Sequence, residues 1–420
     1  MFDLIKSAEN AKKASLSLNA LSDSEINKAL KLSAKLIRDK ADYLKQENKK
    51  DIDNAYEKKL SEAFIDRLTL TDTVIEGIAV GIEQVAELES PRNKVLYSYY
   101  NENQKIDVKK IVVPFGVIGI IYESRPNVTA DAFALCFKTA NAVMLKGGSD
   151  AINSNTAIAN VIREALTKCG IDENALTLIK DTSRETTVEF MKLNGYVDLL
   201  IPRGGASLIN SALENSTIPI IETGKGNCHV YVDEFADIDM AVKVIYNAKT
   251  QRYSVCNACE SLVIHKAVLN KALPKIAEEL KVKQVVIACD EKSYQAIPDY
   301  PYLRHATVDD YGTEYGKAEI SVKTVDSLAE AIDHINLYST KHSESIITEN
   351  LENAEKFIES VDSSCVYHNA STRFSDGFVF GLGAEIGIST QKLHARGPMG
   401  LDGLVTTKYV IKGNGAIRKS

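Results

Sequence analysis

From about residue 110 onward, short apolar runs alternate with amphipathic stretches of helical length, and this alternation constrains the fold more than any other feature. Strands that are separated by helical segments usually pair in parallel, because the crossover helix returns the chain to the same end of the sheet. The pattern therefore predicts a doubly wound parallel sheet with helices on both faces as the first domain. Its apolar runs are Ile111–Val113, Val117–Ile121, Ala142–Leu145, Leu176–Ile179, Leu199–Ile201 and Ile218–Ile221.

A second set of apolar runs follows in the same rhythm. With 420 residues the chain is long enough for two or three domains. We expect a second α/β domain, with its boundary near Val232–Asp239 and with helical segments such as Ser327–Leu337 between its strands. Its predicted strands are Leu262–Ile264, Gln284–Ile287, Ile320–Val325, Ser345–Thr348 and Cys365–Tyr367.

Both ends of the chain depart from this rhythm. The first hundred residues are helical in pattern: Ser22 and Glu25 form a capping box, and apolar residues then recur at helical spacing. This helical arm should lie across a larger core. Near the other end, Leu404–Ile411 reads as one late strand, and Tyr99–Val113 is the segment that we expect to pair with it.

Charge and cysteine usage exclude several classes of protein. The chain has 50 Lys and Arg against 57 Asp and Glu, a net charge of −7, whereas a nucleic-acid-binding domain usually carries a net positive face. Its 7 cysteines are odd in number and scattered, which is typical of reduced thiols. No apolar run approaches the roughly 20 residues of a membrane span. We therefore expect a soluble, cytoplasmic protein without nucleic-acid or membrane partners.

The segment Gln251–Glu260 contains two cysteines, Cys256 and Cys259. A cysteine where a loop enters a helix has a lowered thiol pKa, because the helix dipole stabilises the thiolate. On that reading Cys256 is a nucleophile and Cys259 packs on the helix, and the polar flank formed by Gln251 and Arg252 favours it. Two other interpretations stay open: a thiol-redox or metal-binding pair, and simple packing of buried thiols.

Glycine-rich and polar turns follow several of the predicted strands, where a doubly wound sheet binds phosphates. None completes G-x-G-x-x-G, but together they indicate a nucleotide. In the turn Tyr122–Thr129, the Asn127 amide could donate to an oxyanion and Arg125 could meet an anion, or Asn127 or Thr129 could cap the next helix. The glycine-rich turns are Phe115–Gly119, Lys146–Ser149, Arg203–Gly205 and Thr223–Gly226.

Taken in order, these motifs resemble the aldehyde dehydrogenase superfamily, and more closely its glutamate-5-semialdehyde dehydrogenases, also called γ-glutamyl phosphate reductases. The resemblance covers essentially the whole chain. Its most specific segment is Val325–Ile346. Further matching segments are Ser124–Asn127, Glu222–His229, Ser254–Ala258 and Leu393–Gly400.

The resemblance implies an aldehyde dehydrogenase-like α/β fold in three parts. A Rossmann-like NADP-binding domain would comprise residues 1–98, 114–232 and 386–402. A catalytic α/β domain would comprise residues 233–385. A small β extension, residues 99–113 and 403–420, would serve oligomerisation, so a homo-oligomer is expected.

The activity that the resemblance implies is the NADPH-dependent reduction of L-glutamyl 5-phosphate to L-glutamate 5-semialdehyde and phosphate in proline biosynthesis, through a cysteine thioester. Glutamate 5-kinase, which makes the acyl phosphate, is a possible partner. Two alternatives stay open: an NAD-dependent hydrolytic aldehyde dehydrogenase, and a thiol-redox or metal-binding protein that uses Cys256 and Cys259.

By the same resemblance Cys256 is the nucleophile, and Asn127 with the backbone N–H of Cys256 forms the oxyanion hole. Glu222 matches the carboxylate that activates water in hydrolytic members, but its turn reads Glu-Thr-Gly-Lys-Gly instead of Glu-Leu-Gly-Gly, so its role stays open. The substrate carries an α-carboxylate and a phosphate, which call for cations. The expected cations are Arg125, Arg252, His394 and Arg396.

The resemblance also implies where NADPH would bind, and no metal is expected. Lys146 and Ser149 would lie near the adenosine ribose, Gly204 and Gly205 against the pyrophosphate and nicotinamide side, and Glu319 at the nicotinamide ribose. An acidic residue near the 2′-hydroxyl is the usual sign of NAD. The lysine and the serine therefore favour NADPH.

Overall fold

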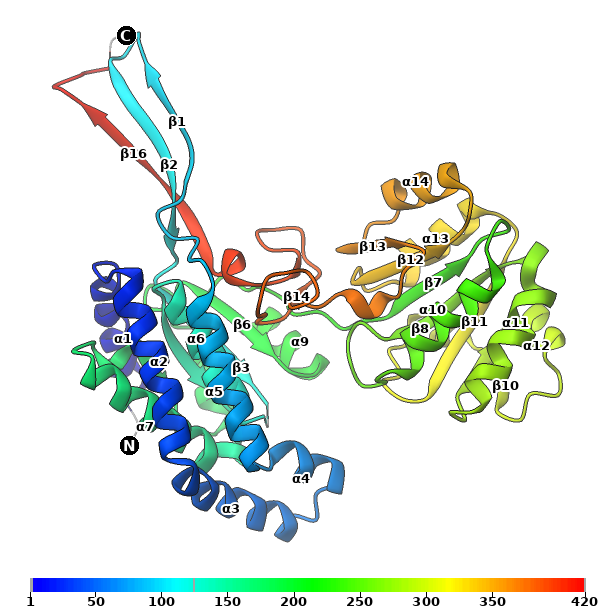
Figure 1. Ribbon diagram of the computed structural model, residues 1–420, viewed down its shortest axis with the longest axis horizontal. Helices are drawn as coiled ribbons and strands as arrows, with labels where there is room; N and C mark the ends of the chain where they lie inside the picture. The colour runs from blue at the N-terminus through cyan, green and yellow to red at the C-terminus, as the bar shows by residue number, and fades with distance from the viewer. Residues whose placement is uncertain (1–2, 124, 419–420) are drawn as a thin grey trace. The chain divides into compact units, whose positions relative to one another are not determined.

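The computed structural model describes residues 3–123 and 125–418, and it divides the chain into two compact units (Figure 1). Unit 1 contains the chain up to Glu222, together with Gly381–Gly387 and the residues from Met399 onward. Unit 2 contains Thr223–Phe380 and Ile388–Pro398. Each unit is built around its own parallel sheet.

Among the described residues, the main sheet of unit 1 has four strands in the order β5-β4-β3-β6, all of them parallel. Every residue of β3 is buried, as expected for a strand that helices cover on both faces. The predicted run Ile218–Ile221 forms only one bridge to β6, between Ile220 and Leu200. The strands are β3 (Val117–Tyr122), β4 (Ala142–Lys146), β5 (Leu176–Leu178) and β6 (Leu199–Arg203).

The helices of unit 1 confirm the predicted helical arm. The capping box is present: the Glu25 N–H donates to Ser22 Oγ, and the Ser22 N–H donates to Glu25 Oε2. Helix α1 packs directly on the sheet, and α2 packs on α5 and α7. These helices are α1 (Leu4–Leu18), α2 (Asp23–Asp39), α3 (Ala41–Glu57), α4 (Glu62–Leu68), α5 (Asp72–Glu87), α6 (Asn127–Lys138), α7 (Ile152–Lys168), α8 (Arg184–Phe190) and α9 (Ala206–Asn215).

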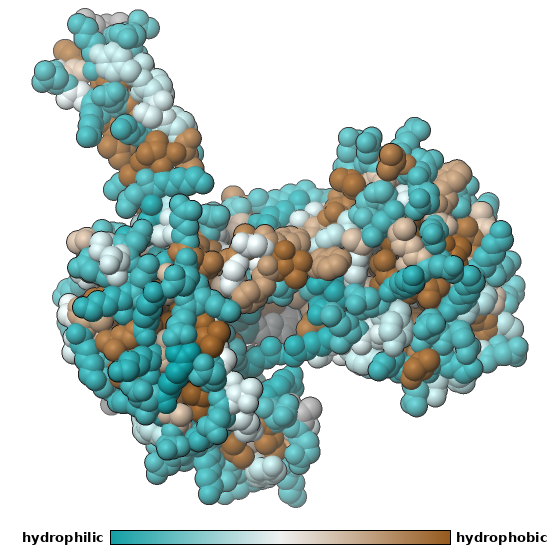
Figure 2. All heavy atoms as spheres, viewed as in Figure 1, coloured by the Kyte–Doolittle hydropathy of each residue, from teal (hydrophilic) through white to brown (hydrophobic). Residues whose placement is uncertain are grey.

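A separate antiparallel ribbon belongs to unit 1: β1 (Val95–Asn101), β2 (Ile106–Pro114) and β16 (Val405–Gly413), in the order β1-β2-β16 (Figure 1). The predicted late strand thus exists and pairs with the predicted segment. The run Ile111–Val113 lies in this ribbon, so its assignment to the first parallel sheet was wrong. Figure 2 shows apolar atoms on the surface of the ribbon, where Leu96 is 49% exposed.

Unit 2 contains, in its described residues, a seven-stranded parallel sheet in the order β10-β9-β11-β8-β7-β12-β13. Its strands are β7 (Cys228–Val232), β8 (Cys259–His265), β9 (Val286–Cys289), β10 (Leu303–His305), β11 (Glu319–Val325), β12 (Ser343–Ile347) and β13 (Cys365–His368). Its helices are α10 (Ile238–Thr250), α11 (Lys266–Lys281), α12 (Glu291–Ala296), α13 (Leu328–Tyr338) and α14 (Leu351–Ser360).

The boundary between the units differs from the expected one because of β7, a strand that the sequence analysis did not predict. All residues of β7 are buried, and it pairs with β8 and β12 in the middle of the second sheet. Unit 2 therefore begins at Thr223 and not near residue 232. The return of the chain differs too. Residues 388–398 stay with unit 2, where β14 (Ile388–Ser389) pairs with β15 (Gly397–Pro398).

Candidate active site

The predicted catalytic cysteine lies in a segment of turns, residues 251–258, which we call the Cys256 loop. Helix α10 ends before this loop at Thr250, and β8 begins after it at Cys259. The expectation that Cys256 stands at the entrance of a helix was therefore wrong. In the sequence, the polar segment before β8 could equally well begin a helix. Only the tertiary structure shows that the backbone enters a strand there.

The turn before β7 holds the backbone of the Cys256 loop. A Cβ atom at Gly226 would lie 1.4 Å from the carbonyl oxygen of Cys256, so the two backbones can touch only because this residue is glycine. The Cys228 thiol donates to the same oxygen, with 3.1 Å between Sγ and O. Of the four glycine-rich turns, Thr223–Gly226 thus packs against the candidate nucleophile loop, and this contact explains its glycine.

The other side of the loop is tied to residues 369–379, which follow β13. The Asn257 side-chain amide donates to the carbonyl oxygens of Ser375 at 2.9 Å and Arg373 at 3.3 Å. The Thr372 hydroxyl donates to the Asn257 carbonyl at 2.7 Å. Burial lowers the pKa of Arg373, whereas the negative charge of a Cys256 thiolate acts in the opposite direction. This cation beside the candidate nucleophile was missed by sequence reasoning.

A buried ion pair joins the two elements that flank the loop. Lys249 Nζ on α10 lies 2.6 Å from Glu260 Oε2 on β8, and neither side chain is exposed. Burial raises the pKa of Glu260 to about 7, against the opposing effect of Lys249. The contacts of Gly226, Asn257 and this pair fix the course of the Cys256 loop from three directions.

Cys259 is not positioned as a partner of Cys256. It is fully buried in β8, its thiol donates to the Ser261 carbonyl, and burial raises its pKa to about 12. Packing is therefore confirmed for Cys259, although in a strand and not on a helix. Within the described ranges, no cluster of three or more His, Cys, Asp or Glu side chains could hold a metal ion.

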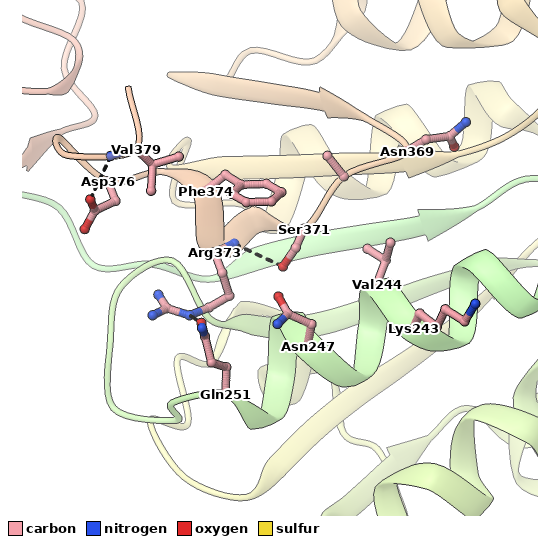
Figure 3. Close-up of a pocket in the computed structure, with 11 residues that line it drawn as sticks. Lys243, Val244, Asn247, Gln251, Asn369, Ser371, Arg373, Phe374, Asp376 and Val379 are labelled. Carbon is pink, nitrogen blue, oxygen red and sulfur yellow. Dashed lines mark hydrogen bonds between the residues drawn. The ribbon is translucent and has the colours of Figure 1, made fainter. Parts of the chain in front are cut away.

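A cavity of about 530 Å³ lies beside the Cys256 loop, between α10 and residues 369–379. In Figure 3, Arg373 and Gln251 meet at one end of this cavity, where Arg373 Nε donates to Gln251 Oε1 at 2.9 Å. Lys243 and Asp376 also line it. At its end nearest the Cys256 loop, the cavity thus offers one cation, Arg373, and one carboxylate, Asp376, to a ligand.

Arg396 is paired with Asp362, which precedes β13. Asp362 accepts from Arg396 at 2.8 Å, Lys392 at 2.8 Å and Lys341 at 3.0 Å, and these cations hold the pKa of its carboxyl well below its usual range. Because Lys341 precedes β12, this cluster lies at the amino-terminal edge of the sheet, as does the Cys256 loop. Arg252 is exposed in that loop.

Two further predicted substrate cations are exposed. His394 is exposed in the 388–398 segment of unit 2, with a positive φ of 67°. Arg125 is exposed in unit 1, just before α6. Ser124, which precedes Arg125 in the matching motif, lies outside the described residues.

In unit 1, the predicted cofactor residues follow the carboxyl ends of the strands. Lys146 ends β4 and is 3% exposed, and burial lowers its pKa while Asp181 opposes this. Ser149 is exposed and begins a short 3₁₀ turn. Both therefore lie at the edge where doubly wound sheets bind nucleotides.

The strand order places the topological switch of this sheet between β3 and β6. There the Gly205 N–H, at the start of α9, donates to Glu123 Oε1 at 3.0 Å. A Cβ at Gly204 would lie 2.7 Å from the same oxygen. The residues present thus fit a dinucleotide, because the N-terminus of α9 lies at the topological switch of a parallel sheet. A bound pyrophosphate would replace Glu123 as the acceptor of the Gly205 N–H.

Asn127 opens α6, and its side chain does not cap the helix. Its amide Nδ2 donates to Asp131 Oδ2 at 2.9 Å. The Thr129 hydroxyl donates to Asn155 Oδ1 and also pairs with the Tyr122 hydroxyl. The capping interpretation is therefore wrong for both residues.

The two predicted carboxylates differ in their surroundings. Glu319 begins β11, where Arg304 and Lys317 contact its carboxylate at 2.6 Å each. Burial raises the pKa of Glu319, but the two cations outweigh burial and bring it below its usual value. Glu222 is half-buried and is the last residue of unit 1 before the chain enters unit 2.

In the part of the chain that the structure describes, no helix is long and apolar enough to cross a membrane.

The chain is similar in sequence and in structure to proteins of one family. Residues 3–295 match the model of the aldehyde dehydrogenase family. The γ-glutamyl phosphate reductase of Lachnospira eligens is 56% identical over 97% of this chain and 98% of its own, and that of Caldicellulosiruptor saccharolyticus is 52% identical over 100% of both chains. The crystal structure of γ-glutamyl phosphate reductase from Thermotoga maritima has a TM-score of 0.97 and 44% identity, with 100% of each chain covered.

Proposed function

Because the chain belongs to the aldehyde dehydrogenase family, and within it to the γ-glutamyl phosphate reductases, we propose that it reduces L-glutamyl 5-phosphate to L-glutamate 5-semialdehyde and phosphate with NADPH. This reaction is a step of proline biosynthesis. The observation that carries the proposal is a Cys256 loop fixed by Gly226 and Asn257 in a chain 56% identical to a reductase of that name.

In the proposed reaction the Cys256 thiolate attacks the acyl carbon of the substrate. The C–O bond to phosphate then breaks, phosphate leaves with that electron pair, and a thioester on Cys256 remains. We assign Asn127 and the backbone N–H of Cys256 as donors to the oxyanion of the tetrahedral intermediate, as the family resemblance implies. Phosphate is a good leaving group, so no water has to be activated, and Glu222 has no role as a general base.

The nicotinamide cofactor, when bound, supplies the hydride that reduces the thioester to the aldehyde. Lys146 would stabilise the 2′-phosphate of its adenosine ribose, with Ser149 beside it, and the Gly205 N–H would donate to its pyrophosphate. Gly204 leaves room for the cofactor because it has no side chain. We propose that Glu319 contacts the nicotinamide ribose.

The cavity beside the Cys256 loop matches the amino-acid end of the substrate in charge. We propose that Arg373 holds its α-carboxylate and that Asp376 holds its α-ammonium group. Arg252, at the open side of the loop, would then face the phosphate. Arg396, His394 and Arg125 stay candidates for the same anions, with Arg396 shared between substrate and Asp362.

The exposed ribbon of β1, β2 and β16 supports a homo-oligomer. It presents Leu96, Tyr97, Tyr409 and Ile411 to solvent, each more than a third exposed, and an apolar surface of this kind is typical of a protein interface. A kinase that makes the short-lived acyl phosphate fits the same scheme as a partner.

The reaction can be tested in reverse by following NADPH formation from glutamate-5-semialdehyde, NADP⁺ and phosphate. We expect turnover that is lost in Cys256→Ala and is much slower with NAD⁺ or with acetaldehyde. Equal rates with acetaldehyde would show that the cavity does not select an amino-acid substrate. Equal rates with NAD⁺ would remove the proposed role of Lys146.

A further inference from the structure

Asp131 lies one helical turn after Asn127 on α6, and the two side chains are hydrogen-bonded. Asn127 Nδ2 donates to Asp131 Oδ2 at 2.9 Å. Asp131 is only partly exposed. Its other oxygen lies 3.7 Å from the position of a Cβ on Gly81, so α5 covers that side of the carboxylate. Nothing in the proposed mechanism so far uses this acid.

The environment of Asp131 keeps it ionised at neutral pH. Burial raises its pKa to about 6, while the hydrogen bond from Asn127 and the positive charge of Arg203 act in the opposite direction. Arg203 lies at the end of β6, a second element, and acts on Asp131 through its charge. At pH 7.5 the group is therefore mostly a carboxylate, which can accept hydrogen bonds but cannot donate them.

An acceptor at this place decides which way the Asn127 amide points. An amide has an NH₂ end and a carbonyl end of nearly the same size, and a change of one torsion angle exchanges them. A carboxylate can bond only to the NH₂ end. With one N–H held by Asp131, the second N–H of the amide lies on the same side, and the carbonyl oxygen is turned away.

We propose that Asp131 is a positioning residue, which holds the amide of Asn127 so that its second N–H is presented to the oxyanion. This inference rests on the proposed role of Asn127. Without Asp131, the amide would also sample the flipped orientation. In that orientation its carbonyl oxygen would face a developing negative charge, which destabilises the transition state.

The effect should appear in kcat. Removal of one oxyanion donor typically lowers kcat about 10²–10³-fold, and a donor that is correctly oriented only part of the time loses less. For Asp131→Asn, which has nearly the same shape but can bond to either end of the Asn127 amide, we expect kcat to fall about tenfold. KM for NADP⁺ should not change.

A double-mutant cycle separates positioning from a structural role. Wild type, Asn127→Ala, Asp131→Asn and the double variant are compared in the phosphate-dependent formation of NADPH, with melting temperature and NADPH affinity measured for each. If Asp131 acts through Asn127, Asp131→Asn causes no further loss of kcat once Asn127 is alanine. Equal and multiplicative losses in the two backgrounds, or full activity of Asp131→Asn, would overturn the inference.

A matched control exists in the same unit. Asp172 also accepts from a nearby asparagine amide, Asn174 Nδ2, at 2.8 Å, but the pair is exposed and precedes β5 at the opposite edge of the sheet. Asp172→Asn should leave kcat unchanged. A tenfold loss there as well would show that any such substitution in unit 1 disturbs activity, and would overturn the specific role of Asp131.

The pH profile gives an independent measurement. As pH falls through about 6, Asp131 takes up a proton and can donate as well as accept, so the amide is no longer fixed and kcat should fall. Asn127 on its own helix donates to Asp131, Arg203 on β6 lowers its pKa through its charge, and Gly81 on α5 adds no charge. The pH profile of Asp131→Asn should lack this fall of kcat on the acid side. A variant profile identical to that of the wild type would contradict the proposal.

Failure of this inference differs from failure of the proposed function. Wild-type turnover that needs phosphate, together with an unimpaired Asn127→Ala variant, would overturn the roles of Asn127 and Asp131 but leave the reaction standing. No phosphate-dependent turnover in the wild type would overturn the proposed reaction and this inference together.

Discussion

At the scale of single residues, Gly226 has the sharpest structural requirement in unit 2. Its backbone touches the backbone of Cys256, and any side chain would overlap the Cys256 carbonyl. A Gly226→Ala variant must therefore move either the turn or the Cys256 loop. We expect it to lose at least 100-fold in kcat because a small displacement of the nucleophile is costly.

Gly77 on α5 is the control for this prediction. A Cβ there would meet no atom within 4 Å, and alanine in a helix interior is about 0.5–1 kcal/mol more favourable than glycine. Gly77→Ala should keep full activity and melt at a slightly higher temperature. Steady-state kinetics and thermal unfolding of the two variants test the contrast, and an active Gly226→Ala would contradict it.

Lys146 makes a prediction about cofactor choice. If its ammonium group stabilises the 2′-phosphate of NADPH, Lys146→Ala should raise KM for NADPH much more than KM for NADH. Lys168→Ala, on the exposed end of α7, should change neither value. Parallel loss with both cofactors in Lys146→Ala would show that this buried lysine supports the fold of the strand end and does not distinguish the two cofactors.

At the scale of elements, the Lys249–Glu260 pair joins α10 to β8 across the Cys256 loop. Breaking a buried pair leaves an uncompensated charge and typically costs roughly 3–5 kcal/mol, whereas replacing both partners by apolar residues is often neutral. Lys249→Met should therefore lower the free energy of unfolding strongly, and Lys249→Met/Glu260→Leu should recover most of it. Urea denaturation of both variants provides the measurement; equal stability of the single and double variants would be the opposite result.

We predict that the ribbon of β1, β2 and β16 is the interface between copies of the chain. A charge at Leu96 or Ile411, which are 49% and 56% exposed in the single chain, should not disturb the fold of the chain but should weaken its association. Light scattering should then show a smaller species for Leu96→Glu or Ile411→Glu. Leu337→Glu, on the exposed face of α13 (73% exposed), is the control and should keep the oligomer mass of the wild type. If the ribbon were not an interface, all three variants would keep that mass.

The strands that the sequence predicts well are those buried on both faces. β3 and β4 appear as nearly continuous apolar runs, because helices cover a parallel sheet on both sides. β7 was missed since its apolar run is interrupted by His229, a fully buried residue whose backbone N–H and Nδ1 pair with Glu344 on β12. Such a partner is invisible before the sheet is assembled.

The candidate site shows the same limit. Cys256, Asn127 and Lys146 could be proposed from the sequence because each stands in a motif that resembles a family. Arg373 stands alone in a Ser- and Thr-rich run, and only the bond to Gln251 and the contact with Asn257 bring it to the cavity. The supposed helix at Cys256 was wrong because a polar segment before a strand and one before a helix look alike.

At the scale of the whole molecule, the expected aldehyde dehydrogenase-like fold is confirmed by the family match and by the structure from Thermotoga maritima. The candidate site residues are divided between two sheets. Unit 1 carries its predicted cofactor residues after the carboxyl ends of its strands, and unit 2 carries the Cys256 loop before the amino ends of its strands.

The central claim is that the Cys256 thioester exchanges with phosphate and not with water. Water is in vast excess, so phosphate can prevail only if the site binds it and no base activates water. The most direct measurement is the rate of NADPH formation from glutamate-5-semialdehyde and NADP⁺ with and without phosphate, with Cys256→Ala as the blank. We predict that turnover requires phosphate or arsenate. Full turnover in phosphate-free buffer would contradict the account, identify a hydrolytic aldehyde dehydrogenase and restore Glu222 as its general base.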